Sequence, residues 1–152
     1  MLGLFKKKAT GNEFKELKGI QIGESEGVKI AEGETASMYA LIDQIEEYRY
    51  LKLVLAGSDK LKTFDGADMM LTGESSLSLE SDTQEIKSDF SYEKNVGLTE
   101  IDFELENDLE DKLKILNPKG IVLKIKSKEL KLSIISDNWE SLFISTPNSS
   151  EE

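Results

Sequence analysis

The stretch that decides the fold is IVLKIKSKELKLSI, residues 121–134. Alternate positions hold Ile121, Leu123 and Ile125 before a short polar connection near Ser127 and Lys128, and Leu130, Leu132 and Ile134 after it. Strict alternation is typical of a strand with one buried face, and two such runs joined by a tight connection predict an antiparallel hairpin. The connection lacks the Asn-Gly or Asp-Gly pair that short hairpin turns favour. The stretch nevertheless predicts a β-rich fold.

The same period of two recurs along much of the chain. The clearest example outside the hairpin is an acidic strand, in which carboxylates alternate with Ile101, Phe103 and Leu105. Further short apolar runs, separated by turn residues, lie at 20–22, 28–30, 51–55, 69–71, 77–79 and 86–92. Short strands with regular turn signals are typical of barrels and sandwiches. We therefore predict a mainly β (α+β) fold, an antiparallel meander that closes as a barrel or a sandwich.

One central segment departs from this rhythm and predicts a helix over Ala36–Glu47. Its apolar residues follow the spacing i, i+3, i+4, i+7 at Met38, Leu41, Ile42 and Ile45. Thr35 is a suitable N-cap for that helix. A second, short helix is expected around Asp108–Leu113, and the chain beyond Trp139 shows no periodicity.

The size of the chain indicates one domain. Its 152 residues fall within the usual range of a single core, and 38% of them are hydrophobic. Their regular spacing distinguishes the chain from a disordered acidic polypeptide. We expect one domain over residues 1–152, with flexible termini at 1–12 and 146–152.

Charge is distributed in blocks within a net of −11. Twelve carboxylates and two lysines lie between Glu80 and Asp111, and the following stretch to Ile134 holds seven lysines and one carboxylate. Opposite charges facing each other across strands contribute roughly 0.2–1 kcal/mol per pair. The blocks therefore predict that the acidic strand lies beside the lysine-rich hairpin, an explanation that needs no ligand.

Missing residue types exclude several kinds of chemistry. The chain has no histidine and no cysteine, and Arg49 is its only arginine. Zinc sites of the usual kinds and Ser-His-Asp or Cys-His nucleophiles are therefore excluded. No phosphate-binding glycine loop is present either. We expect no cofactor and, without disulfides, a cytoplasmic protein. The preference for lysine in an acidic chain suggests a bacterial source.

The carboxylates are the remaining candidates for a functional site. On the outer face of a strand, Asp102, Glu104 and Glu106 would lie about 6.8 Å apart and diverge, so they predict no metal site. With a net charge of −11, nucleic acid is not an expected partner. We expect an acidic, non-catalytic module that binds a basic protein. Two alternatives remain open, a barrel that binds a small apolar ligand and a hydrolase built on two carboxylates.

Aromatic residues are the second class of binding candidates. Tyr48, Tyr50 and Trp139 can bury area at an interface while keeping a polar handle, although each of them could equally pack against the core. Near the start, Leu2, Leu4 and Phe5 precede three lysines, a pattern compatible with weak peripheral membrane contact or with a solvated end. No run of about 18 apolar residues predicts a transmembrane helix.

Overall fold

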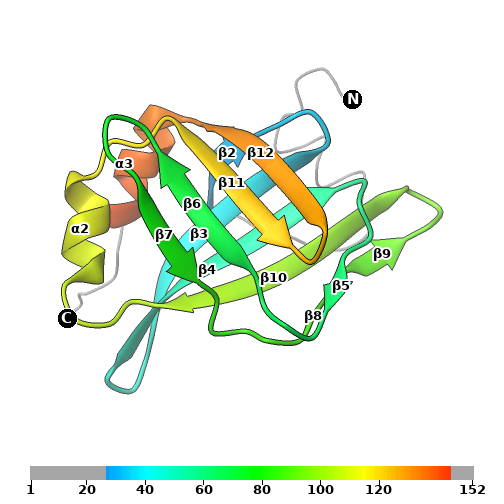
Figure 1. Ribbon diagram of the computed structural model, residues 1–152, viewed down its shortest axis with the longest axis horizontal. Coiled ribbons are helices and arrows are strands. Elements are labelled where there is room, and N and C mark those ends of the chain that lie inside the picture. The colour runs from blue at the N-terminus through cyan, green and yellow to red at the C-terminus, as the bar shows by residue number, and fades with distance from the viewer. Residues whose placement is uncertain (1–26, 145–152) are drawn as a thin grey trace.

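The computed structural model describes residues 27–144, and among these nine strands form one antiparallel sheet that curls into a half-barrel (Figure 1). The order across the sheet is β7-β6-β11-β12-β2-β3-β4-β10-β9. These strands are β2 (Val28–Glu32), β3 (Ala36–Ile45), β4 (Tyr48–Gly57), β6 (Asp68–Thr72), β7 (Leu77–Glu80), β9 (Asp89–Ser91), β10 (Val96–Glu104), β11 (Gly120–Ile125) and β12 (Lys128–Ile134). The mainly β fold is therefore confirmed.

Two short strands and two helices complete the described part of the chain. β5 (Lys62–Thr63) pairs with β8 (Ile86–Lys87) in a separate small sheet. The helices α2 (Leu109–Ile115) and α3 (Ser136–Ile144) lie at one end of the half-barrel, and β5, β8 and β9 lie at the other (Figure 1).

The hairpin predicted from residues 121–134 is confirmed as β11 and β12. Ile121 pairs with Leu132 and Leu123 pairs with Leu130, and all four side chains are buried. The turn holds Lys126 at a φ of 57°. A lysine therefore adopts the left-handed conformation for which glycine or asparagine is preferred, so the turn lacks its usual sequence signature.

The helix predicted over Ala36–Glu47 is wrong, because this segment is strand β3. It pairs with β4 along its whole length, from Ala36 opposite Gly57 to Ile45 opposite Tyr48. Its inward residues are Met38, Ala40 and Ile42, while Tyr39 is buried on the outer face. Because both faces of the strand carry apolar residues, the apolar run also fits a helical period, which the sequence pattern alone does not distinguish.

The acidic strand is β10, but its predicted position beside the lysine-rich hairpin is wrong. β10 lies between β4 and β9, and three strands separate it from β12. Its outward Asp102 instead opposes Lys52 of β4. The hairpin lysines therefore do not neutralise the β10 carboxylates across a strand pair.

The segment that follows β7 forms hydrogen bonds with β10, although the two strands lie near opposite edges of the curled sheet. The Asp82 amide donates to the Asp102 carbonyl at 2.7 Å, and the Asp102 amide donates to the Thr83 hydroxyl at 3.0 Å. One edge of β10 pairs with β4. On its other edge, residues 96–98 pair with β9, and Asp102 makes these contacts further along the strand. An otherwise open strand edge is thus covered within the chain.

One continuous hydrophobic core fills the concave side of the sheet. Strands from every part of the sheet contribute to it, including Leu53, Met69, Phe103, Leu123 and Leu132. Phe103 is among the most completely buried side chains. Alternate residues of each strand therefore point to a shared interior, as the period of two predicts.

The two helices add to the core at one end. The helix predicted around Asp108–Leu113 is confirmed as α2, which buries Leu113. Helix α3 was not predicted, although Trp139, Leu142 and Phe143 have the i, i+3, i+4 spacing of a helical face. The segment is only nine residues long and its first half is mostly polar, so few apolar residues are left to indicate a helical face.

Several predictions concern residues outside the described range 27–144. These are the strand at 20–22, the membrane contact of Leu2, Leu4 and Phe5, and the flexible termini at 1–12 and 146–152. Within the described range, no helix is long and apolar enough to span a membrane.

Candidate functional site

The outer face of β3, β4 and β10 gathers acidic side chains around a tyrosine. In one row across the three strands, Tyr50 lies between Asp43 and Glu104, its register partners on the two neighbouring strands. In the next row, Lys52 opposes Asp102. Residues in register on adjacent strands point to the same face of the sheet, so these five side chains share one surface. We call this surface, Asp43, Tyr50, Lys52, Asp102 and Glu104, the acidic face.

The structure brings together most of the residues predicted from the sequence. Asp102, Glu104 and Tyr50 belong to the acidic face itself. Tyr48 lies one row further towards the tip of the β3–β4 hairpin and is 46% exposed. Glu106 follows the end of β10 and contacts the Glu104 carboxyl. These five residues therefore form one contiguous surface region.

Trp139 does not belong to the acidic face, and the sequence analysis did not identify two residues that do, Asp43 and Lys52. The indole of Trp139 is 3% exposed, packs edge-to-face on Phe143 at 5.4 Å and belongs to the interior core. Asp43 was missed because its strand resembles a helix in sequence. Lys52 was recognised only as an alternating strand residue, since its pairing with Asp102 depends on the order of strands in the sheet.

The electrostatics of Asp102 indicate a surface with an excess of negative charge. Partial burial is the main cause of its raised pKa, and the Lys52 ammonium opposes this effect. The other charges raise the pKa further, and they belong to Glu100, Asp82 and Asp43. Among the described residues, Asp102 Oδ1 is buried without a hydrogen-bond partner. One lysine is thus too little to compensate the carboxylates around it.

Glu104 and Tyr50 show the same effect. Partial desolvation is the first cause of the raised pKa of Glu104, followed by the charges of Glu106 and Asp82 and a hydrogen bond with Glu106. The pKa of Tyr50 is also raised, first by desolvation and then by the charge of Glu104. Both raised pKa values show that additional negative charge on this face is unfavourable. A cation placed here would lower both pKa values.

Replacing Asp102 with asparagine is expected to stabilise the protein at neutral pH by up to about 1 kcal/mol, because it removes a partly desolvated charge and its repulsion from nearby carboxylates. A carboxyl whose pKa is raised by folding destabilises the folded state when ionised. The advantage should therefore shrink as the pH falls through the folded pKa towards the unfolded value. Urea unfolding of both proteins over that pH range measures the difference. An asparagine variant that is less stable at neutral pH would contradict this interpretation.

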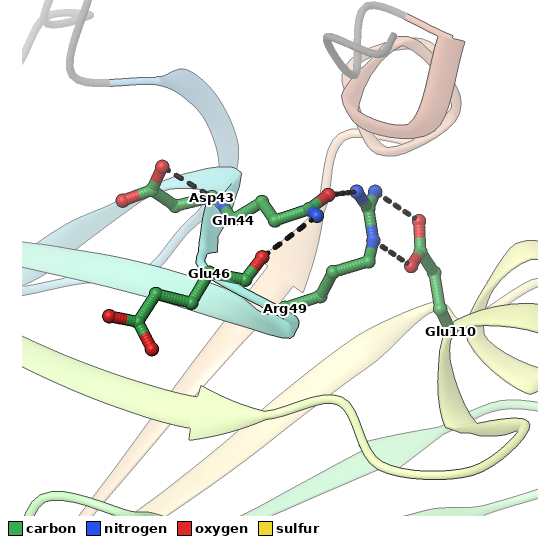
Figure 2. A network of polar contacts seen from close by, with 5 residues as sticks. All are labelled: Asp43, Gln44, Glu46, Arg49 and Glu110. Carbon is green, nitrogen blue, oxygen red and sulfur yellow. Dashed lines mark hydrogen bonds and ion pairs between the residues drawn. The ribbon is translucent and has the colours of Figure 1, made fainter. Parts of the chain in front are cut away.

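Arg49 fixes the end of the strands that carry the acidic face (Figure 2). Its Nε and Nη2 donate to the two carboxylate oxygens of Glu110 at 2.7 and 2.9 Å, and its Nη1 donates to Gln44 at 3.0 Å. The hydrogen bond from Arg49 is the main cause of the lowered pKa of Glu110. Since Glu110 lies in α2 and Arg49 in β4, the pair connects the hairpin to the helix.

The interior offers different chemistry from the acidic face. The buried polar side chains of the described residues are the hydroxyls Thr63, Ser81, Ser88 and Thr99. Ser88 and Thr99 hydrogen-bond each other at 2.8 Å, and the Ser88 hydroxyl also accepts from the Leu61 amide. Within residues 27–144 no three carboxylates converge closely enough to hold a metal ion. None of the described aspartates, glutamates, lysines and arginine is thus among the buried residues.

Comparisons with known proteins add no relative from which a function could be transferred. No family model, curated protein or solved structure matches this chain.

Proposed function

We propose that this protein is a non-catalytic interaction module whose acidic face binds a basic segment of a partner protein. The observation that carries the proposal is the row of Asp43, Tyr50 and Glu104 beside Asp102, with Lys52 as the one cation in these two rows. Desolvation and then the charges of neighbouring carboxylates raise the pKa of Asp102 and of Glu104, and a cationic ligand would be favoured there because it replaces repulsion with attraction.

The aromatic residues suit the same kind of ligand. Lysine and arginine side chains bind over tyrosine rings as well as to carboxylates, and Tyr48 and Tyr50 follow each other on the outer side of β4. Tyr48 is substantially exposed, whereas Tyr50 is half-buried between two acidic neighbours. An interface of this composition would be polar at its rim and would depend strongly on charge.

Neutralising Asp102 and Glu104 together is expected to weaken binding of an oligolysine peptide about five- to tenfold. Each charge pair at a surface contributes up to about 1 kcal/mol, and 1.4 kcal/mol corresponds to a factor of ten. The variant is Asp102→Asn/Glu104→Gln, measured by titration calorimetry at low salt. Its control is Asp68→Asn/Glu129→Gln, which removes the same charges from exposed positions on β6 and β12.

The control separates a local site from the effect of net charge. The acidic-face variant should lose affinity while the control keeps nearly all of it. Equal losses in both variants would show that the peptide responds to the overall charge of −11 and would contradict a site at this face. Binding should also slow steeply with added salt, because opposite charges accelerate association mainly at low ionic strength.

A further inference from the structure

The β3–β4 hairpin extends beyond the neighbouring strands of the sheet. Within the described chain, β2 pairs with β3 only as far as Ala40, and β10 pairs with β4 only as far as Tyr50. The hairpin continues to Ile45 and Tyr48, which are register partners at its end. In Figure 1 this end projects past the arrowhead of β10. The tip of the hairpin, residues 45–48, is therefore accessible from outside the sheet.

The tip presents two large apolar side chains to solvent. Ile45 is 57% exposed and Tyr48 is 46% exposed. Each lies two residues along its strand from an acidic-face residue, Ile45 from Asp43 and Tyr48 from Tyr50. Residues two apart on a strand point to the same side of the sheet. The apolar pair therefore lies on the outer side, directly beside the acidic face.

A second apolar group on this side, further along the same strands, is closed. This outer cluster consists of Tyr39, Val54, Ala56 and Leu98. Its four side chains are only 4–9% exposed. The outer cluster therefore offers no surface to a ligand, whereas the pair at the tip does.

Hydrogen bonds hold the inner side of the tip in place (Figure 2). Gln44 Nε2 donates to the Glu46 carbonyl at 3.1 Å, and Gln44 Oε1 accepts from Arg49. Arg49 in turn donates to both carboxylate oxygens of Glu110 in α2. The turn is therefore ordered without a ligand, and an ordered site loses less conformational entropy on binding.

Negative charge surrounds the apolar pair. The turn itself consists of Glu46 and Glu47, both exposed, and the next outward row holds Asp43 and Glu104. Contact between the tips of two copies of this chain would bring these carboxylates together, so like-charge repulsion opposes a symmetric dimer. A ligand complementary to the tip therefore combines an apolar side chain with positive charge.

We propose that the basic segment bound by the acidic face carries one large apolar residue, which packs against Ile45 and Tyr48. This specificity rests on the function proposed above, because it concerns the partner of the same face. Successive outward residues of a strand lie about 6.8 Å apart, as do residues i and i+2 of an extended segment. With its apolar residue at the tip, such a segment places a lysine or arginine two positions further on beside Asp43, Tyr50 and Glu104.

Two capped peptides of equal charge test the apolar contact. One is a leucine followed by five lysines, and the other has a serine in place of the leucine. We expect the leucine peptide to bind the full chain about three- to tenfold more tightly at low salt, the effect of burying part of a leucine side chain. Titration calorimetry measures both affinities. The amide NMR shifts that differ between the two complexes should centre on residues 45–48.

The variant Ile45→Thr/Tyr48→Thr removes both large side chains from the tip. Threonine is suited to a strand, and the net charge is unaltered. The two peptides should bind this variant nearly equally. Its control is Phe64→Thr/Met70→Thr, which removes apolar side chains that are 61% and 39% exposed elsewhere on the surface. The control should retain the advantage of the leucine peptide.

Equal binding of the two peptides to the unaltered chain would overturn the apolar contact and leave binding at the acidic face intact. If neither peptide binds, both the contact and the proposed function are wrong, so the two failures are distinguishable. A leucine advantage that persists in the tip variant would also overturn the contact. The same holds for a dimer of the unaltered chain that the tip substitutions dissociate in sedimentation experiments, because a second copy would then occupy the tip.

Discussion

Replacing Phe103 with alanine is expected to lower the free energy of unfolding by about 3–5 kcal/mol, the range for removing a buried aromatic ring. Phe103 is 1% exposed and lies in β10, in register with the buried Leu51 of β4. The substitution removes the ring's contacts and leaves a cavity beneath the strand that carries Asp102 and Glu104. Urea unfolding followed by the fluorescence of Trp139, the single tryptophan, measures the change.

The control for this substitution is Tyr92→Ala, which removes an aromatic ring that is 71% exposed. It should change the free energy of unfolding much less. Phe103→Leu provides a milder variant with an expected cost of about 1–2 kcal/mol, should the alanine variant fail to fold. A cost below about 1 kcal/mol for Phe103→Ala would contradict a well-packed interior and would favour the alternative of a ligand cavity.

Breaking the pair of Arg49 and Glu110 is expected to cost about 1.5–3 kcal/mol, the range for hydrogen bonds to charged groups. Both side chains are less than a third exposed, and the contact is bidentate. Glu110→Gln keeps the shape of the side chain but removes its charge and one acceptor. Arg49→Lys keeps the charge but loses the planar fork, so it should also destabilise the protein.

The pH dependence of Glu110→Gln gives a second, independent readout. The pKa of Glu110 is lowered in the folded state, so the unfolded chain binds its proton first as the pH falls. The stability that this carboxylate contributes is therefore complete above its unfolded pKa and is lost as the pH falls through the folded pKa. The variant and the unaltered protein should converge in acid.

An exposed ion pair is the appropriate control for this prediction. Lys124 and Glu129 face each other across β11 and β12 at 3.7 Å, and both are about half exposed. Glu129→Gln should change the stability by less than about 1 kcal/mol, as is usual for surface pairs. If Glu110→Gln costs no more than Glu129→Gln, the Arg49 contact does not anchor the hairpin to α2.

Local patterns predicted most of the strands but not β3, in which both faces carry apolar residues. Except at Val122, the hairpin of residues 121–134 alternates between apolar and polar residues, so its structure follows from its sequence. In β3 the outward Tyr39 and Leu41 add to the inward residues, and the resulting run also matches a helical period. The outer cluster that explains Tyr39 depends on β4 and β10, which are distant in sequence.

The candidate site was predicted in part for a related reason. Alternation placed Asp102 and Glu104 on one face of a strand, and this holds in β10. Which charges face them depends on strand order, and strand order is a long-range property. The acidic strand β10 therefore lies beside Lys52 of β4, with Asp43 on the next strand, and the lysine-rich hairpin lies on another part of the sheet.

Amide NMR mapping of oligolysine binding tests the proposed function most directly. The isotope-labelled protein is titrated with the peptide at low salt, and the chemical shift changes are followed by residue. We expect the largest changes at Asp43, Tyr50, Asp102 and Glu104, and we expect them to disappear at high salt. Changes that are spread evenly over the surface, or that centre on β6 and β7, would contradict a binding site on the acidic face.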